Sequence, residues 1–274
     1  RCVISASPCL VTAKAYVQMT RWTTGNTVKY LIICDNMRFI GSLRIDPIEK
    51  LARLATRNTI LGLINSDGDI RSHTMNPWDQ RFEADEYVFG TEPAKALLKL
   101  EPYLVPNGTT LVVADGEGRN SVYLASKGFK VTATDYSKVG VDKAKRLARD
   151  RNVSVHYVVE DIFERDWGSE QYDNVVAVFI QFVPPAQMTK VLTDLATSVK
   201  PHGTLLVHGY TPAQVEFGTG GPPNAEHMYT EALLRETYQH LDIQVCEEYI
   251  DTLNEGRGHS GKSALIDFVG NKNA

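Results

Sequence analysis

The 274-residue sequence lacks several features that define specialised classes of protein. Its four cysteines include no Cys-x-x-Cys pair, which excludes a disulfide scaffold and a sequence-evident zinc finger, and we predict no metal site. No run approaches the roughly 18 apolar residues that a membrane-spanning helix needs, so we expect no membrane partner. The net charge of −4 excludes a generally basic surface, and we therefore expect no nucleic acid partner.

What is present is a globular composition that changes at Met75. Residues 1–74 contain ten Lys or Arg and five Asp or Glu, with no acid before Asp35, and they hold three of the four cysteines. The remaining residues contain 19 basic and 28 acidic side chains. The change predicts an N-terminal extension over residues 1–74 and a main domain over residues 75–274.

The extension shows two strand-like runs, at residues 28–34 and 59–64, and one helix-like run at residues 46–57. Three interpretations remain open. The basic, acid-free start is typical of an organellar transit peptide. The segment is otherwise a small accessory domain, or an upstream extension that forms no stable part of the main domain. We expect a cytoplasmic location, or an organellar one if a transit peptide is present.

Beyond residue 92, helix-period and strand-like runs alternate. The expected helices occupy residues 92–104, 120–127 and 138–151, a run opened by Pro184 and Pro185, and residues 230–241. The expected strands occupy residues 110–115, 129–135, 153–160, 172–180, 204–209, 243–249 and 263–269.

This alternation implies right-handed βαβ crossovers and a mostly parallel sheet. Only the polar segment 251–262 separates the last two strands, and it is too short for a parallel crossover, so we expect the last strand to be antiparallel. The predicted fold class is α/β, with a Rossmann-like, seven-stranded, mostly parallel sheet, an antiparallel last strand and helices on both faces.

Glycines and acids end three consecutive predicted strands. Gly116 and Gly118 follow the first strand and let the backbone approach a ligand closely. Asp135 ends the second strand, at about the spacing at which an acid meets a ribose hydroxyl. Asp161 ends the third, where a carboxylate accepts a hydrogen bond from the amine of adenine. Ligands bind at this edge of a parallel sheet, so the pattern predicts an adenosine-containing ligand; the alternative is that both acids only cap turns.

The glycine turn itself favours one adenosine ligand over another. Ser121 occupies the position of the third glycine of a dinucleotide fingerprint, and the turn contains Asp115 and Glu117. Carboxylates repel a pyrophosphate but attract the sulfonium and ammonium groups of S-adenosylmethionine. We therefore predict S-adenosylmethionine as the cofactor.

Eight short motifs follow in order after the boundary: Trp78-Asp-Gln-Arg-Phe82, Tyr87-Val-Phe-Gly90, Gly116-Glu-Gly-Arg-Asn120, Asp135-Tyr-Ser137, Asp161-Ile162, Tyr210-Thr-Pro212, Gly218-Thr-Gly-Gly-Pro-Pro223 and Gly258-His-Ser-Gly261. With these motifs, residues 78–269 resemble the class I S-adenosylmethionine-dependent methyltransferases, specifically the tellurite-resistance methyltransferase group. The resemblance covers nearly all of the chain after Met75 and none before it. The predicted cofactor-binding residues are Asp115, Gly116, Gly118, Asn120, Asp135, Tyr136, Asp161, Ile162 and Phe179.

One departure concerns the first family motif, which usually carries an acid two residues before its first glycine. In this chain Val112 stands at the acid position and Ala114 at the glycine. Asp115 is then the candidate for the missing carboxylate. If it does not supply that carboxylate, a binding-only role follows.

Candidate substrate contacts follow from topology. Gln181 comes after the fourth strand, near where a transferred methyl is expected, and either orients a nucleophile or satisfies loop backbone. Trp78, Tyr87 and Phe89 precede the first sheet strand and either close over the site as an aromatic lid or pack this segment onto the sheet.

Two loops are expected at the same edge. Residues 218–223 are too rich in Gly and Pro for regular structure and are predicted to form a substrate loop rather than a plain connection. Arg257 and His259 lie in the segment that joins the last two strands. As a guanidinium and an imidazolium they suit an anionic substrate, and the alternative is an ordinary solvated loop.

We predict that residues 75–274 transfer a methyl group from S-adenosylmethionine to a small-molecule acceptor. The resemblance favours a thiol or a chalcogen oxyanion. A non-catalytic S-adenosylmethionine-binding protein is the alternative that Val112 and Ala114 keep open. A nucleotide-dependent oxidoreductase is less favoured because the third glycine is absent.

Overall fold

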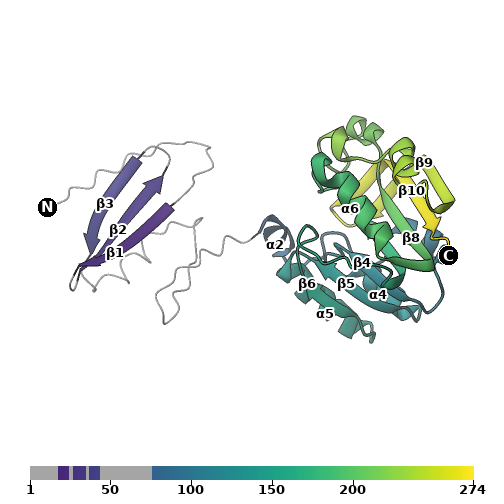
Figure 1. The fold of residues 1–274 in the computed structure, drawn as a ribbon, viewed down its shortest axis with the longest axis horizontal. Helices are drawn as coiled ribbons and strands as arrows, with labels where there is room; N and C mark the ends of the chain where they lie inside the picture. The colour runs from purple at the N-terminus through teal and green to yellow at the C-terminus, as the bar shows by residue number, and fades with distance from the viewer. Residues whose placement is uncertain (1–17, 25–26, 35–36, 44–75) are drawn as a thin grey trace. The chain divides into compact units, whose positions relative to one another are not determined.

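The strands of the chain form two separate sheets, one in each of two units (Figure 1). The computed structural model describes residues 18–24, 27–34, 37–43 and 76–274. The chain divides into the units Arg1–Thr74 and Met75–Ala274.

The first unit contains a three-stranded antiparallel sheet in the order β1-β2-β3. The strands are β1 (Gln18–Thr24), β2 (Thr27–Cys34) and β3 (Met37–Leu43). The strand predicted at residues 28–34 is confirmed as β2. The helix predicted at residues 46–57 and the strand predicted at residues 59–64 lie outside the described residues.

The second unit contains a seven-stranded sheet in the order β6-β5-β4-β7-β8-β10-β9. Its strands are β4 (Thr109–Val113), β5 (Lys130–Asp135), β6 (His156–Val159), β7 (Tyr172–Val178), β8 (Val199–Tyr210), β9 (Asp242–Glu255) and β10 (His259–Asn271). The strands β4 to β8 pair in parallel, whereas β10 pairs antiparallel with both β8 and β9. The predicted fold class is confirmed.

The helices of this unit lie on both faces of the sheet (Figure 1). They are α2 (Pro77–Phe82), α3 (Lys95–Leu100), α4 (Arg119–Ser126), α5 (Lys138–Asp150), α6 (Pro185–Thr197) and α7 (Glu231–Thr237), with 3-10 helices η1 (Glu101–Tyr103), η2 (Pro212–Glu216) and η3 (Ala225–His227). Ser137 caps α5 as predicted, because its hydroxyl accepts a hydrogen bond from the Gly140 amide at 2.9 Å.

Two apolar cores form because side chains along a strand alternate between the faces of the sheet. In β4, Leu111 and Val113 belong to the core under α6 and α7. Val112, between them, belongs to the core under α3 and α4. Val112, at the position where the motif of the resembled family would place an acid, is therefore a buried core residue (1% exposed).

The loop predicted at residues 251–262 is wrong in its extent. β9 continues to Glu255, β10 begins at His259, and these two residues pair with each other. Only residues 256–258 remain for the turn, where Gly256 has a φ of 71°. The end of β9 is polar, and backbone pairing with β10 does not require apolar side chains. The hydropathy pattern therefore did not predict this part of the strand.

Other predicted boundaries also shift. The helix expected at residues 92–104 divides into α3 and η1, since Pro93 and Pro102 lack the amide hydrogen that a continuous helix needs. β8 begins at Val199 rather than at residue 204 and passes through His202, whose φ is 63°. Among the described residues, no helix has the length and apolar character to cross a membrane.

Candidate active site

A cavity of about 660 Å³ opens at the carboxyl ends of the parallel strands, a volume typical of small-molecule sites. Asp115 and Asp135 reach it from the ends of β4 and β5, and Phe179 and Tyr210 from the ends of β7 and β8. From β4 the chain builds β5 and β6 on one side and then crosses back to place β7 and β8 on the other side. The cavity therefore lies at the point where the strand order reverses.

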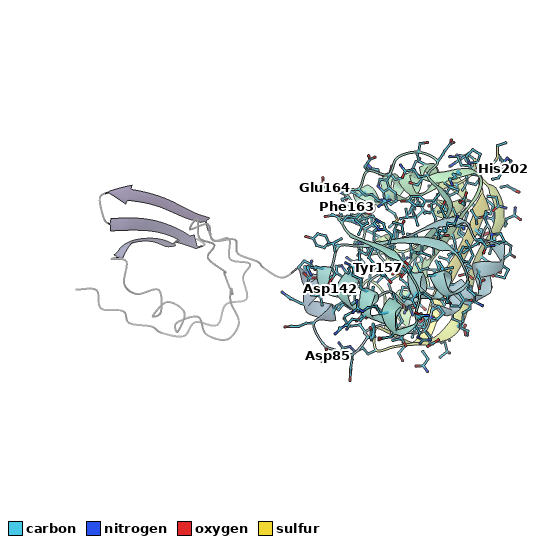
Figure 2. The ribbon with its side chains drawn as sticks, turned by 90° about the horizontal axis from the view of Figure 1, so that it is seen from below. Asp85, Asp142, Tyr157, Phe163, Glu164 and His202 are labelled. Carbon is cyan, nitrogen blue, oxygen red and sulfur yellow. The ribbon has the colours of Figure 1, made fainter. Side chains whose placement is uncertain are left out.

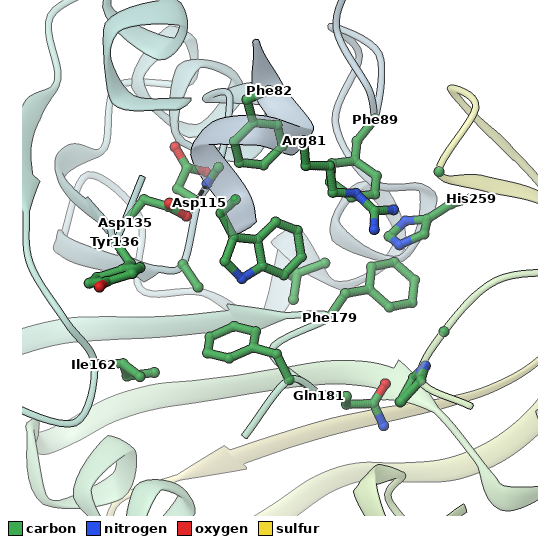
Figure 3. A pocket seen from close by; sticks show the side chains of 18 of the residues that line it. Arg81, Phe82, Phe89, Asp115, Asp135, Tyr136, Ile162, Phe179, Gln181 and His259 are labelled. Atoms are coloured by element: carbon green, nitrogen blue, oxygen red, sulfur yellow. Dashed lines mark hydrogen bonds between the residues drawn. The ribbon is translucent and has the colours of Figure 1, made fainter. Parts of the chain in front are cut away.

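The cavity has an acidic end, which contains Asp115 and Asp135, and an aromatic end, which contains Phe89, Phe179, Tyr210 and His259. Figure 3 shows Asp115, Asp135 and Tyr136 on one side and Phe89, Phe179 and His259 on the other. The predicted residues that line it are Trp78, Phe89, Asp115, Gly116, Asn120, Asp135, Tyr136, Asp161, Ile162, Phe179, Gln181 and His259. The predicted residues outside the lining are Tyr87, Gly118 and Arg257.

Asp135 is fixed by two backbone amides. Its carboxylate oxygens accept hydrogen bonds from the Gly116 and Ser137 amides, both at 2.7 Å. Burial raises the pKa of Asp135 to about 6 despite these bonds. The glycine turn and the acid that ends β5 are thus joined directly, with the carboxylate at the cavity wall.

Asp115 is buried and is held by Ser121. Its carboxylate accepts hydrogen bonds from the Ser121 amide at 3.2 Å and from the Ser121 hydroxyl. Burial raises the pKa of Asp115 to about 7. Ser121, which replaces a glycine of the dinucleotide fingerprint, therefore has a specific role: it orients the carboxylate of this turn.

Glu117 does not point into the cavity, contrary to the expectation that it attracts the cationic cofactor. Its carboxylate lies 2.5 Å from the Lys143 ammonium and accepts a hydrogen bond from the Val88 amide at 2.7 Å. Gly118 also faces away, because a Cβ there would lie 2.6 Å from Ala144 of α5. These two residues fasten the turn to neighbouring segments, which leaves Asp115 as the acid of the turn that meets a ligand.

Of the remaining predicted cofactor residues, Asn120, Tyr136, Asp161 and Ile162 also line the cavity, and Phe179 lies at its aromatic end. The Asn120 side-chain oxygen accepts a hydrogen bond from the Ala94 amide at 2.9 Å, and Asp161 accepts one from the Phe163 amide at 2.9 Å. Tyr136 is half exposed at the rim. His202 lies at the opposite end of the domain from Phe163, a residue of the cavity wall (Figure 2).

Gln181 is paired on both sides with the backbone of Tyr210. Its amide nitrogen donates to the Tyr210 carbonyl at 2.7 Å, and its oxygen accepts from the Tyr210 amide at 2.6 Å. A Cβ at Gly209 would lie 2.6 Å from the Gln181 oxygen, so glycine makes room for this pair. Of its two predicted roles, the geometry supports the satisfaction of loop backbone.

Of the three aromatic residues predicted to form a lid, two line the cavity and one does not. Trp78 stacks on Phe82 with ring centroids 5.6 Å apart and lines the cavity, as does Phe89. Tyr87 instead packs beside α5, where its hydroxyl donates to the Lys143 carbonyl at 3.2 Å. Trp78 and Phe89 therefore belong to the wall, and Tyr87 belongs to the packing.

His259 lies at the aromatic end but does not carry the expected charge. Its ring centroid lies 4.1 Å from that of Phe179 and 4.5 Å from that of Phe89. Burial lowers the pKa of His259 to about 4, although Glu255 opposes this at 3.9 Å. The imidazole is thus neutral near pH 7, while Arg257 is exposed and lies outside the lining. Neither residue therefore places a positive charge on the cavity wall near pH 7.

The wall residues that were not singled out from sequence include four with polar or charged side chains that matter below: Arg81, Arg119, Tyr210 and His227. Arg119 is neutralised by Glu255 at 2.7 Å, and the Arg81 guanidinium lies 5.3 Å from the Phe89 ring centroid. Three of the four stand inside the quoted motifs, which was the available signal. His227 lies in no motif.

Comparisons with known proteins agree with this geometry. A family model described as "Methyltransferase domain" matches residues 111–203. A "Ubiquinone biosynthesis O-methyltransferase" from Rickettsia akari (strain Hartford) is 28% identical over 151 residues, which cover 50% of this chain. The aligned part spans only 59% of that curated relative.

Solved structures share the fold. One, described as "Conversion of a Disulfide Bond into a Thioacetal Group during Echinomycin Biosynthesis", has a TM-score of 0.59 and 16% identity, covering 72% of this chain and 92% of that chain. TehB from Haemophilus influenzae has a TM-score of 0.55 and 17% identity, covering 72% and 66%.

The family match identifies residues 111–203 as a methyltransferase domain. The sheet order of the second unit is that of the class I, S-adenosylmethionine-dependent fold. Its cofactor is S-adenosylmethionine. The residues fit this group, because the desolvated carboxylates of Asp115 and Asp135 gain from the hydroxyl donors and positive charges that it offers. The match of residues 111–203 to a methyltransferase family model favours methyl transfer over the nucleotide-dependent oxidoreductase alternative.

Proposed function

We propose that the protein transfers a methyl group from S-adenosylmethionine to an uncharged small molecule that enters at the aromatic end. The observation that carries this proposal is the single cavity with an acidic end and an aromatic end (Figure 3). A methyl donor and an acceptor must meet in one closed space, and this cavity offers two chemically different halves.

At the acidic end, Asp135 would hold the ribose hydroxyls, and Asp161 with Tyr136 and Ile162 would border the adenine. Asp115 would face the positively charged part of the cofactor. Bound S-adenosylmethionine supplies an electrophilic methyl group whose transfer leaves a neutral thioether. The protein then has to align the acceptor and exclude water.

At the aromatic end, neutral His259 would accept the proton that the acceptor loses. Of the acceptors that the sequence favours, a thiol fits better than a chalcogen oxyanion. Arg81 and Arg257 are exposed, Arg119 is already paired with Glu255, and burial lowers the pKa of His259. Among the described residues of the cavity wall, no buried cation is therefore left unpaired for an anionic acceptor. A hydroxyl is the second candidate, since the curated relative is named as an O-methyltransferase.

We further propose that the protein belongs to the tellurite-resistance group, is cytoplasmic and has no nucleic acid partner. Membership of the tellurite-resistance group rests on the quoted motifs, with TehB as a structural neighbour that shares the fold. The cytoplasmic location and the lack of a nucleic acid partner rest on composition and charge.

The test is formation of S-adenosylhomocysteine by the full chain with a panel of thiols, phenols, amines and oxyanions. We expect turnover with a thiol or a phenol, and none with oxyanions. His259→Ala should lower turnover about a hundredfold or more while S-adenosylmethionine affinity is kept. Arg257→Ala and His202→Ala are the matched controls and should stay near wild type.

Two outcomes count against the proposal. Tight binding of S-adenosylmethionine with no product from any acceptor would establish the non-catalytic alternative. Fastest turnover with an oxyanion, abolished by Arg257→Ala, would restore the prediction that Arg257 and His259 bind an anionic substrate.

A further inference from the structure

Three residues that line the cavity carry polar atoms without partners. Among the described residues, the Tyr210 hydroxyl, the His227 Nδ1 and the His259 Nδ1 are buried and make no hydrogen bond. All three residues line the cavity. Buried polar groups are usually paired, and unpaired ones at a cavity wall point to a partner that arrives from outside the chain.

The three residues come from three separate segments that meet at this cavity. Tyr210 ends β8, His227 ends η3 and His259 opens β10. The Tyr229 amide donates to the Tyr210 carbonyl at 3.0 Å, which places the segment after His227 against the end of β8. The Tyr210 and His259 rings have centroids 5.8 Å apart. The arrangement is therefore fixed by backbone pairing and ring packing rather than by the polar atoms themselves.

Tyr210 differs from a core tyrosine of the same domain. Tyr238 is equally buried, but its hydroxyl donates to the Leu192 carbonyl at 3.0 Å. The Tyr210 hydroxyl has no such acceptor, although the residue is only 1% exposed. Burial raises the pKa of Tyr210, so the hydroxyl keeps its proton and is available as a donor.

The loop at residues 218–223 closes over Tyr210. A Cβ at Gly220 would lie 3.0 Å from the Tyr210 hydroxyl, and one at Gly221 would lie 2.8 Å from the Tyr210 ring. Their φ values of 141° and 83° also favour glycine. Gly221, Pro222 and Pro223 line the cavity, so this loop both covers the hydroxyl and borders the space in front of it.

The surroundings define the chemistry of the ligand. The rings of Phe89, Phe179 and Tyr210 offer flat apolar surface, and the buried charge of Arg119 is already balanced by Glu255. Arg81, the other cation of this wall, is exposed and keeps its contact with water. The buried part of the site therefore suits a planar, uncharged molecule, because an unbalanced charge would be desolvated there without a counter-ion.

We propose that the Tyr210 hydroxyl and the His227 Nδ1 form a second anchoring point for the methyl acceptor. The acceptor is then a planar, uncharged molecule that carries its nucleophilic hydroxyl or thiol beside His259 and another hydrogen-bonding group beside Tyr210 and His227. This inference rests on the proposed function and adds the substrate class to it. Tyr210 and His227 act here as binding and positioning residues.

The experiment measures binding of simple probes to the full chain saturated with S-adenosylhomocysteine. The probes are phenol, its three dihydroxy counterparts (catechol, resorcinol and hydroquinone) and para-hydroxybenzoate as the anion. We expect at least one dihydroxybenzene to bind about three- to tenfold more tightly than phenol, the gain of one added hydrogen bond, and the anion to bind more weakly than phenol.

Variants assign the gain to the two residues. Tyr210→Phe keeps the ring and His227→Ala removes the imidazole, and each should bring the ratio toward one without changing S-adenosylhomocysteine affinity. Tyr238→Phe is the matched control, since it removes a buried hydroxyl that does not belong to the cavity wall. It should lower thermal stability but leave the ratio of dihydroxybenzene to phenol affinity unchanged.

Equal binding of phenol and all three dihydroxybenzenes would overturn the proposal, as would an unchanged ratio in both folded variants or tightest binding of the anion. The outcome is separable from the proposed function. A ratio that responds to Tyr210→Phe without turnover on any acceptor leaves the anchoring point standing and removes the methyl transfer. Methyl transfer with equal binding of phenol and the dihydroxybenzenes would support the proposed function and remove the anchoring point.

Discussion

At the scale of single residues, the cavity wall divides into polar groups that the protein satisfies and groups that it leaves for a ligand. Gln181 has both its polar atoms bonded to the Tyr210 backbone, and Asp115 is bonded to Ser121. The hydroxyl of Tyr210 and the Nδ1 of His227 have no partner among the described residues. The bonded groups hold the shape of the wall. The unpaired groups can gain a hydrogen bond from the acceptor and so contribute to its affinity.

Asp135→Ala should weaken S-adenosylmethionine binding by about 1–3 kcal/mol, because ribose hydroxyls would lose their acceptor in a closed cleft. Calorimetric titration measures this. Asp142→Ala is the control, since Asp142 is an exposed acid on α5 that pairs only with Lys138. An Asp135→Ala protein that keeps its fold and its cofactor affinity would refute the assignment.

Cofactor affinity should increase as the pH rises from about 5 to about 8. Burial raises the pKa of Asp135 to about 6 and that of Asp115 to about 7. Both carboxyls lose a proton within this range, and only the ionised forms attract the positive charges of the cofactor. The measurement is the dissociation constant against pH, with Asp115→Asn expected to flatten the upper part of the curve. A flat profile in the wild-type protein contradicts the assignment of both acids.

The same two shifts act in the opposite direction on the unliganded fold. A raised carboxyl pKa means that the folded protein binds more protons than the unfolded chain between about pH 4 and the folded pKa. These two groups therefore lower stability as pH rises through that window. Over the same pH range, ionisation of Asp115 and Asp135 lowers the stability of the unliganded protein and raises its affinity for the cofactor.

At the scale of elements, the turn after β4 carries backbone strain. Ala114 stands where relatives of the resembled family carry glycine, and its φ is 49°. A residue with a Cβ is disfavoured by about 1–2 kcal/mol in this left-handed region. Replacement of the motif's glycine by Ala114 therefore changes the backbone energy of the turn as well as its side chain.

Ala114→Gly should stabilise the protein by about 0.5–1 kcal/mol. Relief of the left-handed strain exceeds the added freedom of the unfolded chain, which is about 0.4–1 kcal/mol. Denaturant unfolding measures the change. Ala125→Gly, inside α4, is the matched control and should destabilise by about 1 kcal/mol, since its backbone is helical. Equal losses in both variants would show that the turn is not strained.

The elements themselves were predictable where apolar periodicity is strong. The strands β4, β5 and β7 are buried runs bounded by turn residues, and α6 shows a clear 3.6-residue period. The hairpin extension of β9 and β10 was not predictable, because its residues are polar and only the partner strand reveals the pairing.

At the scale of the whole molecule, the two ends of the cavity differ in how far the sequence predicts them. The acidic end follows from chain order, since each parallel strand delivers its last residue to one edge. The aromatic end joins α2, the end of β8, η3 and the start of β10, which bring Arg81, Tyr210, His227 and His259 to one wall. Motifs identify some of these residues, but only the tertiary fold makes them neighbours.

The second unit should fold and bind cofactor by itself. A chain of residues 75–274 contains the whole seven-stranded sheet and every residue of the cavity wall, and the chain divides at Thr74 and Met75. We propose that residues 1–74 are dispensable for this binding. A native state that alone binds S-adenosylmethionine gains about 2.7 kcal/mol when the ligand reaches a hundred times its dissociation constant. Thermal unfolding of the truncated and full chains with increasing cofactor measures this gain. Should the truncated chain be insoluble, or fold without responding to the cofactor while the full chain responds, residues 1–74 are an integral part of the enzyme, because the cavity would then need the first unit to reach its binding-competent form.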